Sequence, residues 1–124
     1  MTGLECLALA IYFEARGEPL EGKIAVAEVI YNRVVDPRYP SDICSVVYER
    51  KQFSWTHDGK SDRPKDHKKY KEILELSKKI QKGNLFVGDG VTHYHSTKVK
   101  PYWRNSLTRV KQIGNHIFYR WELK

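Results

Sequence analysis

The chain has 124 residues, 40% hydrophobic and 30% charged, a balance that favours one globular domain over residues 1–124 and excludes a disordered or fibrous protein. Its 22 Lys and Arg residues outnumber its 15 Asp and Glu residues, and the resulting net charge of +7 favours a polyanionic partner. The longest apolar stretch, 24–31, contains Glu28 and is too short to span a bilayer, so we expect no membrane insertion.

The N-terminal segment and the two cysteines indicate in which cellular compartment the protein resides. The segment lacks the positive charges of a signal peptide and carries Glu5, which predicts a protein made and kept in the cytosol. Cys6 and Cys44 are too few for a disulfide framework. Because the cytosol keeps thiols reduced, we expect two free, partly buried cysteines, with a single bridge as the alternative.

The first part of the chain has helical periodicity. Apolar residues recur three and four positions apart, and Pro19 interrupts them, which predicts helices over about 4–15 and 20–34. The centre of the second helix is apolar almost all round, so we expect it to be the buried central helix. Ser41 can cap a short helix over 42–49.

A polar segment and a third main helix follow. Residues 50–66 predict a long loop. Asp66 can cap a helix over about 67–82, and Gly83 can end it.

The remaining part of the chain has the two-residue period of strands. Gly114-Asn115 separates two strand-like runs, 109–113 and 116–121, which is typical of a β-hairpin. Helices followed by a small antiparallel sheet predict an α+β fold. A strand over 91–96 would place alternate side chains on one side, namely Val91, His93 and His95, and Thr92, Tyr94 and Ser96 on the other.

Two carboxylates are candidates for acid–base chemistry. Glu14 lies on the apolar stripe of the first helix, in its last turn, where burial and the helix dipole disfavour the anion. We therefore expect a raised pKa, which suits a general acid. Glu18 lies at the start of the next helix, where an anion is favoured, and such contrasting pairs are typical of acid–base sites. The structural alternative is that Glu14 pairs with Arg16 or Arg33 while Glu18 caps a helix.

Histidines and aromatic residues gather toward the C-terminal end. His93, His95 and His116 could hold a metal ion if the hairpin brings them together, but no metal-binding motif accompanies them. Histidines that face a substrate or lie in the core are the alternative. Aromatic residues in loops and at strand ends are typical of platforms for sugars or nucleic-acid bases. A metal-dependent nuclease and a non-catalytic binding module are therefore alternatives to an enzyme that uses the two glutamates.

Several motifs resemble one family. The segment 12–19, YFEARGEP, and the downstream triplet 32–34, NRV, resemble the opening of the SleB/CwlJ-type cell-wall hydrolases. Further matching motifs follow in the same order: Gln52-Phe53-Ser54, Thr92-His93-Tyr94-His95, Pro101-Tyr102-Trp103 and Ile113-Gly114-Asn115-His116-Ile117-Phe118-Tyr119. The resemblance covers almost the whole chain and implies a lysozyme-like α+β fold, with a mainly helical lobe and a small β lobe around a glycan groove.

The resemblance also implies an activity. It implies cleavage of peptidoglycan between N-acetylmuramic acid and N-acetylglucosamine, by a monomer that needs no cofactor or metal and binds no nucleic acid. It assigns the catalytic glutamate to Glu14, which the burial argument also selects, and makes Glu18 a second candidate. The residues expected to bind substrate are Gln52, Ser54, His93, Tyr94, His95, Trp103, Asn115, His116 and Tyr119.

Counting carboxylates favours one reaction type. One well-placed acid suffices for a lytic transglycosylase, with Glu14 as single general acid and base, whereas a hydrolytic muramidase would also use Glu18. The sequence has no signal segment and no wall-binding repeat, which favours a phage endolysin that reaches the wall after release, with a spore enzyme as the second expectation.

Overall fold

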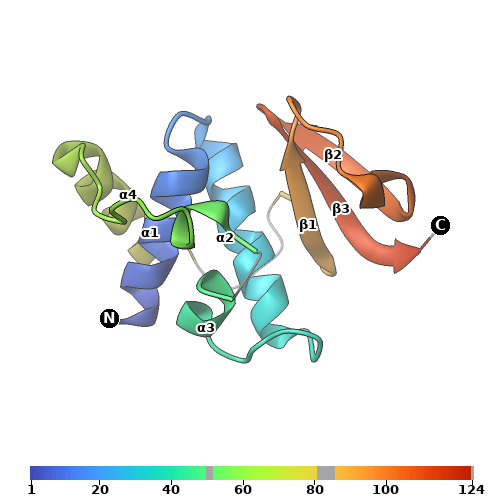
Figure 1. The fold of residues 1–124 in the computed structure, drawn as a ribbon, viewed down its shortest axis with the longest axis horizontal. Helices are drawn as coiled ribbons and strands as arrows, with labels where there is room; N and C mark the ends of the chain where they lie inside the picture. Colours follow the sequence, from blue (N-terminus) through green and yellow to red (C-terminus); the bar gives the residue numbers. More distant parts are fainter. Residues whose placement is uncertain (50–51, 81–85, 124) are drawn as a thin grey trace.

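The computed structural model describes residues 1–49, 52–80 and 86–123 and confirms the α+β class. Figure 1 shows helices in one part of the molecule and an antiparallel sheet in the other, with α2 between α1 and the sheet. In the described ranges, no helix combines the length and the apolar character needed to cross a bilayer. In chain order, the elements are α1 (Gly3–Ala15), α2 (Leu20–Val35), α3 (Ile43–Val47), η1 (Ser54–Thr56), α4 (His67–Lys79), β1 (Val91–Ser96), η2 (Tyr102–Asn105), β2 (Leu107–Ile113) and β3 (His116–Leu123).

Helix α2 is the centre of the fold because it is apolar on two faces. Val26 and Ile30 belong to the core that α2 shares with α1, α3, η1 and α4. Ala25 and Val29 pack instead against the sheet, where Phe118 is fully buried. These two contacts confirm the predicted central helix and explain why its apolar residues run almost all round.

Side-chain caps define where α1 and α4 begin. At α1, Thr2 Oγ1 accepts a hydrogen bond from Glu5 N at 3.1 Å, and Glu5 Oε1 accepts one from Thr2 N at 2.9 Å. At α4, the Asp66 carboxylate accepts from Lys69 N at 2.9 Å, which confirms the predicted cap. The predicted end of this helix at Gly83 lies outside the described residues.

The cap of α3 differs from the prediction by one residue. Asp42, not Ser41, is the N-cap. Its carboxylate accepts bonds from both the backbone N–H and the hydroxyl of Ser45, at 2.9 and 2.7 Å. Two carboxylate oxygens can satisfy two donors at once, which favours Asp42 over the neighbouring serine.

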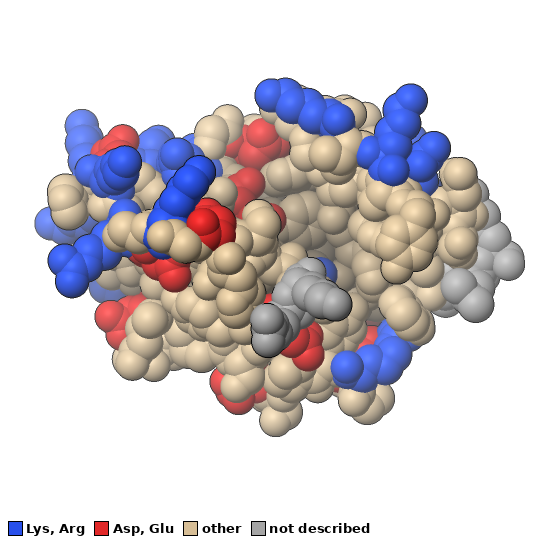
Figure 2. All heavy atoms as spheres, in the orientation of Figure 1, with Lys and Arg blue, Asp and Glu red and all other residues tan. Residues whose placement is uncertain are grey.

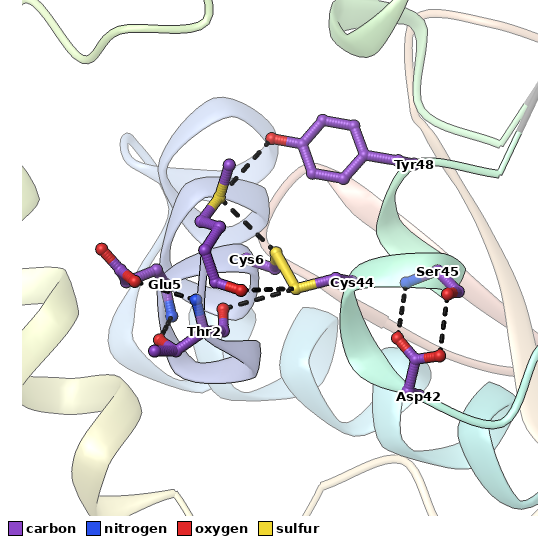
Figure 3. Close-up of a disulfide and its surroundings, with 8 residues drawn as sticks. Thr2, Glu5, Cys6, Asp42, Cys44, Ser45 and Tyr48 are labelled. Atoms are coloured by element: carbon purple, nitrogen blue, oxygen red, sulfur yellow. Dashed lines mark hydrogen bonds between the residues drawn. A yellow bond between two sulfur atoms is a disulfide. The ribbon is translucent and has the colours of Figure 1, made fainter.

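Cys6 and Cys44 form a disulfide that joins α1 to α3 (Figure 3). Their Cα atoms lie 5.3 Å apart. The expectation of two free thiols is therefore wrong. It rested on compartment and cysteine number, whereas the packing of α1 against α3, which places the two residues within bridging distance, decides the outcome.

A bulge in β1 changes which side chains share a face of the sheet. The strand order is β1-β3-β2, and the register of β1 with β3 shifts between Val91 and His93. Val91 consequently packs into the core with Phe118, on the side of Tyr94. His93 and His95 lie on the other side. The prediction that Val91 shares a face with the histidines is wrong, because a bulge moves the alternation by one residue.

Polar side chains of α2 fix the segment that enters β1. The buried carboxylate of Glu28 accepts hydrogen bonds from the backbone N–H groups of Phe86 and Val87, at 2.8 and 2.9 Å. One turn later, Asn32 Nδ2 donates to the Val91 carbonyl at 2.9 Å. The sheet is thus attached to α2 by directional bonds as well as by apolar packing.

Candidate active site

A hollow lies between the helical part and the sheet on the face shown in Figure 2, with acidic side chains along its helical side. Glu14 lies in the last turn of α1 and is half-buried. The hydroxyl of Tyr94, in β1, donates a hydrogen bond to the Glu14 carboxylate. This bond joins residues 80 positions apart in sequence and links the helical part directly to the sheet.

The surroundings of Glu14 favour its protonated form. Burial raises the pKa of Glu14, while the Tyr94 hydrogen bond and the charge of Arg33 act in the opposite direction with smaller effect. Burial and the adjacent Glu14 also raise the pKa of Tyr94 well above its usual value, so its hydroxyl stays a proton donor near neutral pH. The raised Glu14 pKa agrees with the sequence prediction and suits a general acid.

Arg33 is a buried cation near the site. Its Nε donates to the Thr92 carbonyl at 2.9 Å, and its guanidinium carbon lies 5.3 and 5.4 Å from the ring centres of Tyr39 and Phe53. Its Nη1 has no acceptor among the described residues. Within those residues Arg33 and Glu14 form no ion pair, so Arg33 acts on the carboxylate through its charge at a distance.

From the sequence alone, Arg33 is expected only as a structural partner of Glu14. The signal that could have identified it is an arginine in the last turn of the helix that the sequence predicts to be buried at the centre of the fold. Because a buried charge is costly, an arginine in such a place is retained for its contacts or its field.

Glu18 holds the hairpin between β2 and β3. Its Oε1 accepts from Asn115 N at 2.8 Å and its Oε2 from Asn115 Nδ2 at 3.2 Å. Lys23 Nζ donates to the Glu18 carbonyl at 2.5 Å. Gly114 lies so close that a Cβ there would overlap the Glu18 carboxylate. The structure thus brings the predicted residues Glu18 and Asn115 together, in contacts that position the hairpin.

His116 follows this hairpin and packs beside Tyr94. It is buried, and the two ring centres are 5.0 Å apart. Burial lowers the pKa of His116, with the charge of Glu18 opposing this effect, so the ring is neutral near pH 7. Its Nδ1 is buried without a partner in the described part of the chain. Tyr94, Asn115 and His116 therefore gather near the two glutamates.

Other predicted substrate-binding residues form an aromatic cluster on the opposite face of the sheet. His93 pairs with Tyr119 across β1 and β3, and these positions alternate with Tyr94. His95 Nε2 accepts a hydrogen bond from the Tyr119 hydroxyl at 2.8 Å. The Trp103 ring contacts three members of the cluster, with ring centres 5.1 to 5.6 Å apart: His93, His95 and Tyr119.

His93 is half-buried among aromatic rings. Burial lowers its pKa to about 4, and the charges of Arg33 and Arg38 act in the same direction. Trp121 stacks on its ring at 5.2 Å, and the Arg38 guanidinium lies 4.1 Å from the Trp121 ring centre. These contacts support the packing role that the sequence analysis left open for the histidines.

The geometry argues against the metal-centre alternative. His93 and His95 lie on one face of the sheet and His116 on the other, so the three rings do not converge. Over residues 1–49, 52–80 and 86–123, no group of three His, Cys, Asp or Glu side chains could hold a metal ion.

Gln52 and Ser54 are exposed residues at η1. In the same segment, Trp55 is buried and stacks on Phe13, with ring centres 4.8 Å apart. This contact packs the η1 segment against the end of α1 that carries Glu14. Gln52 and Ser54 of this segment are open to solvent.

Comparisons with known proteins fit this architecture. A family model described as cell wall hydrolase matches residues 17–119. The spore cortex-lytic enzymes of Halalkalibacterium halodurans, Oceanobacillus iheyensis and Bacillus subtilis are 33%, 30% and 29% identical over 115 residues. These matches cover 93% of this chain but only 34%, 40% and 36% of the relatives. The chain therefore spans less than half the length of the curated relatives it matches.

Two solved structures are similar over their catalytic domains. One is the catalytic domain of the germination-specific lytic transglycosylase SleB from Bacillus anthracis, with a TM-score of 0.73 and 27% identity over 95% of this chain and 93% of that one. The other is the catalytic domain of the Bacillus cereus SleB protein, with a TM-score of 0.70 and 28% identity over 95% and 89%. Both confirm the fold expected from the sequence motifs.

Proposed function

The chain belongs to the cell wall hydrolase family, and on this premise we propose that it cleaves peptidoglycan between N-acetylmuramic acid and N-acetylglucosamine as a lytic transglycosylase. The observation that carries the proposal is Glu14, a half-buried carboxyl group of α1 with a raised pKa that accepts a hydrogen bond from Tyr94 of the sheet. The similarity to a domain named as a lytic transglycosylase supports the reaction class.

The reaction needs one carboxyl group. Glu14 donates its proton to the glycosidic oxygen, the bond from this oxygen to C1 of the muramic sugar breaks, and positive charge develops at C1. The ionised Glu14 then removes the proton of the muramic 6-hydroxyl group, whose oxygen bonds to C1. The products are a 1,6-anhydromuramic end and a free sugar hydroxyl, with Glu14 protonated again and no water consumed.

Neighbouring residues support both states of Glu14. Tyr94 orients the carboxyl group through its hydrogen bond, and the positive charge of Arg33 favours the anion formed after proton transfer. Both carboxylate oxygens of Glu18 bond to Asn115. This engagement favours the transglycosylase over a hydrolytic muramidase in which Glu18 activates water or attacks C1.

Mass spectrometry of the products tests the proposal. Purified peptidoglycan is digested in water enriched in oxygen-18, and the released muropeptides are analysed. We expect anhydromuramic ends without label. Labelled reducing ends would identify a hydrolase and require a second catalytic group, with Glu18 as the first candidate. Absence of released sugar would contradict glycan cleavage.

We further propose that the enzyme acts outside the reducing cytosol. The similarity to spore cortex-lytic enzymes supports action in the spore. The Cys6–Cys44 disulfide supports action in an oxidising compartment, because disulfides persist there and are reduced in the cytosol. A phage lysis enzyme, which the sequence analysis favoured, stays a prediction. Immunodetection of the protein in purified spores and in phage-infected cells distinguishes the two settings.

A further inference from the structure

We propose that a cavity at the C-terminal end of α1, the helix that carries Glu14, binds the carboxylates of the peptide stem that the muramic sugar carries, an inference that rests on the proposed function. The cavity has a volume of about 370 Å³ and lies between α1 and the segment that precedes α4. Its lining includes Tyr12, Phe13 and Arg16 of α1, Trp55 of η1, and Arg63 and Lys65.

The position of the cavity suits a group attached to the substrate. Phe13 and Arg16 lie at the same end of α1 as Glu14, although their side chains leave the helix on another side. The segment before α4 runs in front of α1 in Figure 1 and is fixed there by a hydrogen bond from Asp66 N to the Tyr12 hydroxyl, at 3.0 Å. The muramic sugar bears its peptide on the lactyl group, so a peptide that extends from a sugar at Glu14 around the end of α1 reaches this surface.

The wall of the cavity is basic. Figure 2 shows Lys and Arg side chains gathered at the helical end of the molecule, over α4 and the segment before it. Among the described residues, none of the basic side chains of the cavity forms an ion pair. Cations without a fixed counter-charge at a concave wall favour an anionic ligand. The charged lining residues are Arg16, Lys60, Arg63 and Lys65 against Asp58 and Asp62.

Trp55 adds an unsatisfied donor. The side chain is 7% exposed, and its Nε1–H is buried without an acceptor in the described part of the chain. The indole is fixed by its stacking on Phe13. Buried donors without a partner are rare in proteins, and a carboxylate or carbonyl oxygen of a ligand in the cavity would satisfy this one. A peptide stem supplies both kinds of oxygen.

The experiment compares two forms of one substrate. Peptidoglycan freed of anionic wall polymers is used with its peptide stems intact, or after removal of the stems by an amidase. The double variant Arg63→Ala/Lys65→Ala is compared with Lys71→Ala/Lys79→Ala, which removes the same charge from exposed positions of α4. We expect the first variant to lose about threefold to tenfold in kcat/KM on the peptide-bearing form and less than about twofold on the stripped form. The control variant should change neither value.

A second variant tests the donor. Trp55→Phe keeps a ring that stacks on Phe13 and removes the N–H, so we expect a loss of about twofold to tenfold that is confined to the peptide-bearing form. Equal losses on both substrates would overturn the peptide site and indicate general damage. The same loss in Lys71→Ala/Lys79→Ala would also overturn the peptide site, because it would show that the net positive charge of the molecule, and not the cavity, attracts the peptide-bearing substrate. Wild-type protein inactive on both forms would contradict the proposed function itself.

Discussion

At the scale of single residues, the proposed reaction depends on how the protein surrounds one carboxyl group. Glu14 is withdrawn from water at the end of α1, bonded by Tyr94 from β1 and influenced by Arg33 from α2. Three separate elements therefore set its protonation state. Each of these contacts can be changed alone, so the role of each residue can be measured.

Glu14→Gln should fold as the wild type does and lose more than about 10²-fold in rate, because its amide cannot deliver a proton. The amide oxygen can still accept the Tyr94 hydrogen bond, so the site keeps its shape. Muropeptide release measures the rate, and thermal unfolding checks the fold. Glu21→Gln, at an exposed position early in α2, is the control. A rate within a few fold of wild type would remove Glu14 from the mechanism.

The pH dependence of kcat/KM should show the effect of the hydrogen bond from Tyr94 to Glu14. The first step of the proposed reaction needs protonated Glu14, so kcat/KM should fall as pH rises through the Glu14 pKa. Tyr94 lowers that pKa, and Tyr94→Phe should therefore move the alkaline limb to higher pH while it also slows the reaction. Tyr119→Phe removes a hydroxyl on the other face of the sheet and should leave the limb in place. A shift to lower pH would contradict this account.

The same raised pKa makes stability depend on pH. A carboxyl group whose pKa is higher in the folded protein stabilises it fully below the unfolded pKa, and this contribution disappears as pH rises through the folded value. Glu14 should therefore contribute less to stability toward alkaline pH.

At this scale the sequence predicts the raised pKa of Glu14, because an acidic residue on an apolar stripe is withdrawn from water. It does not reveal that His116 lies on a different face from His93 and His95. That separation depends on how β1 and β3 pair, and the bulge after Val91 makes simple alternation unreliable in this strand.

At the scale of elements, the hairpin of β2 and β3 is attached to the turn between α1 and α2. Glu18 makes this attachment through Asn115, and Gly114 leaves the room for it. The hairpin continues directly into His116, which packs on Tyr94. A displacement of the turn between α1 and α2 would therefore also shift His116 and the neighbouring Tyr94, whose hydroxyl bonds to Glu14.

The Glu18–Asn115 attachment should be measurable by a double-mutant cycle. Glu18→Gln, Asn115→Ala and the double variant are unfolded in urea, and we expect a coupling free energy of about 0.5–1.5 kcal/mol. The exposure of Asn115 keeps the value in this modest range. Glu18→Gln should weaken substrate binding more than turnover. A coupling near zero, or a loss confined to kcat, would count against a positioning role.

Helix positions are predicted well because local signals define them. The apolar periodicity gives α1 and α2 within one or two residues, and Asp66 marks the start of α4. The cap of α3 is misassigned to Ser41 because two adjacent residues, Ser41 and Asp42, are both good caps. Their contacts with Ser45 distinguish them only in the folded chain.

At the scale of the whole molecule, α2 separates two cores and the disulfide ties α1 to α3. Periodicity along the chain predicts the central helix. It cannot predict the bridge, because Cys6 and Cys44 are 38 residues apart and meet only through the packing of helices. The division of the aromatic residues between two faces of the sheet also depends on residues distant in sequence, because it follows from the pairing of β1 with β3.

The disulfide should stabilise the fold substantially. Closing a loop of 38 residues corresponds to about 4 kcal/mol in the chain-entropy model. The double variant Cys6→Ser/Cys44→Ser should therefore unfold at lower urea concentration by roughly this free energy. Reductant should bring the wild type toward the variant and leave the variant unchanged. Equal stabilities of the oxidised wild type and the variant would contradict the prediction.

The bridge also has a topological consequence. It closes a covalent ring that contains Glu14, all of α2 and the turn after it, where Arg38 is exposed. A protease that cuts the backbone after Arg38 would open this ring without releasing a fragment. The piece that carries Glu14 and the piece that carries Tyr94 would remain one molecule, migrating as a single band until a reducing agent separates them.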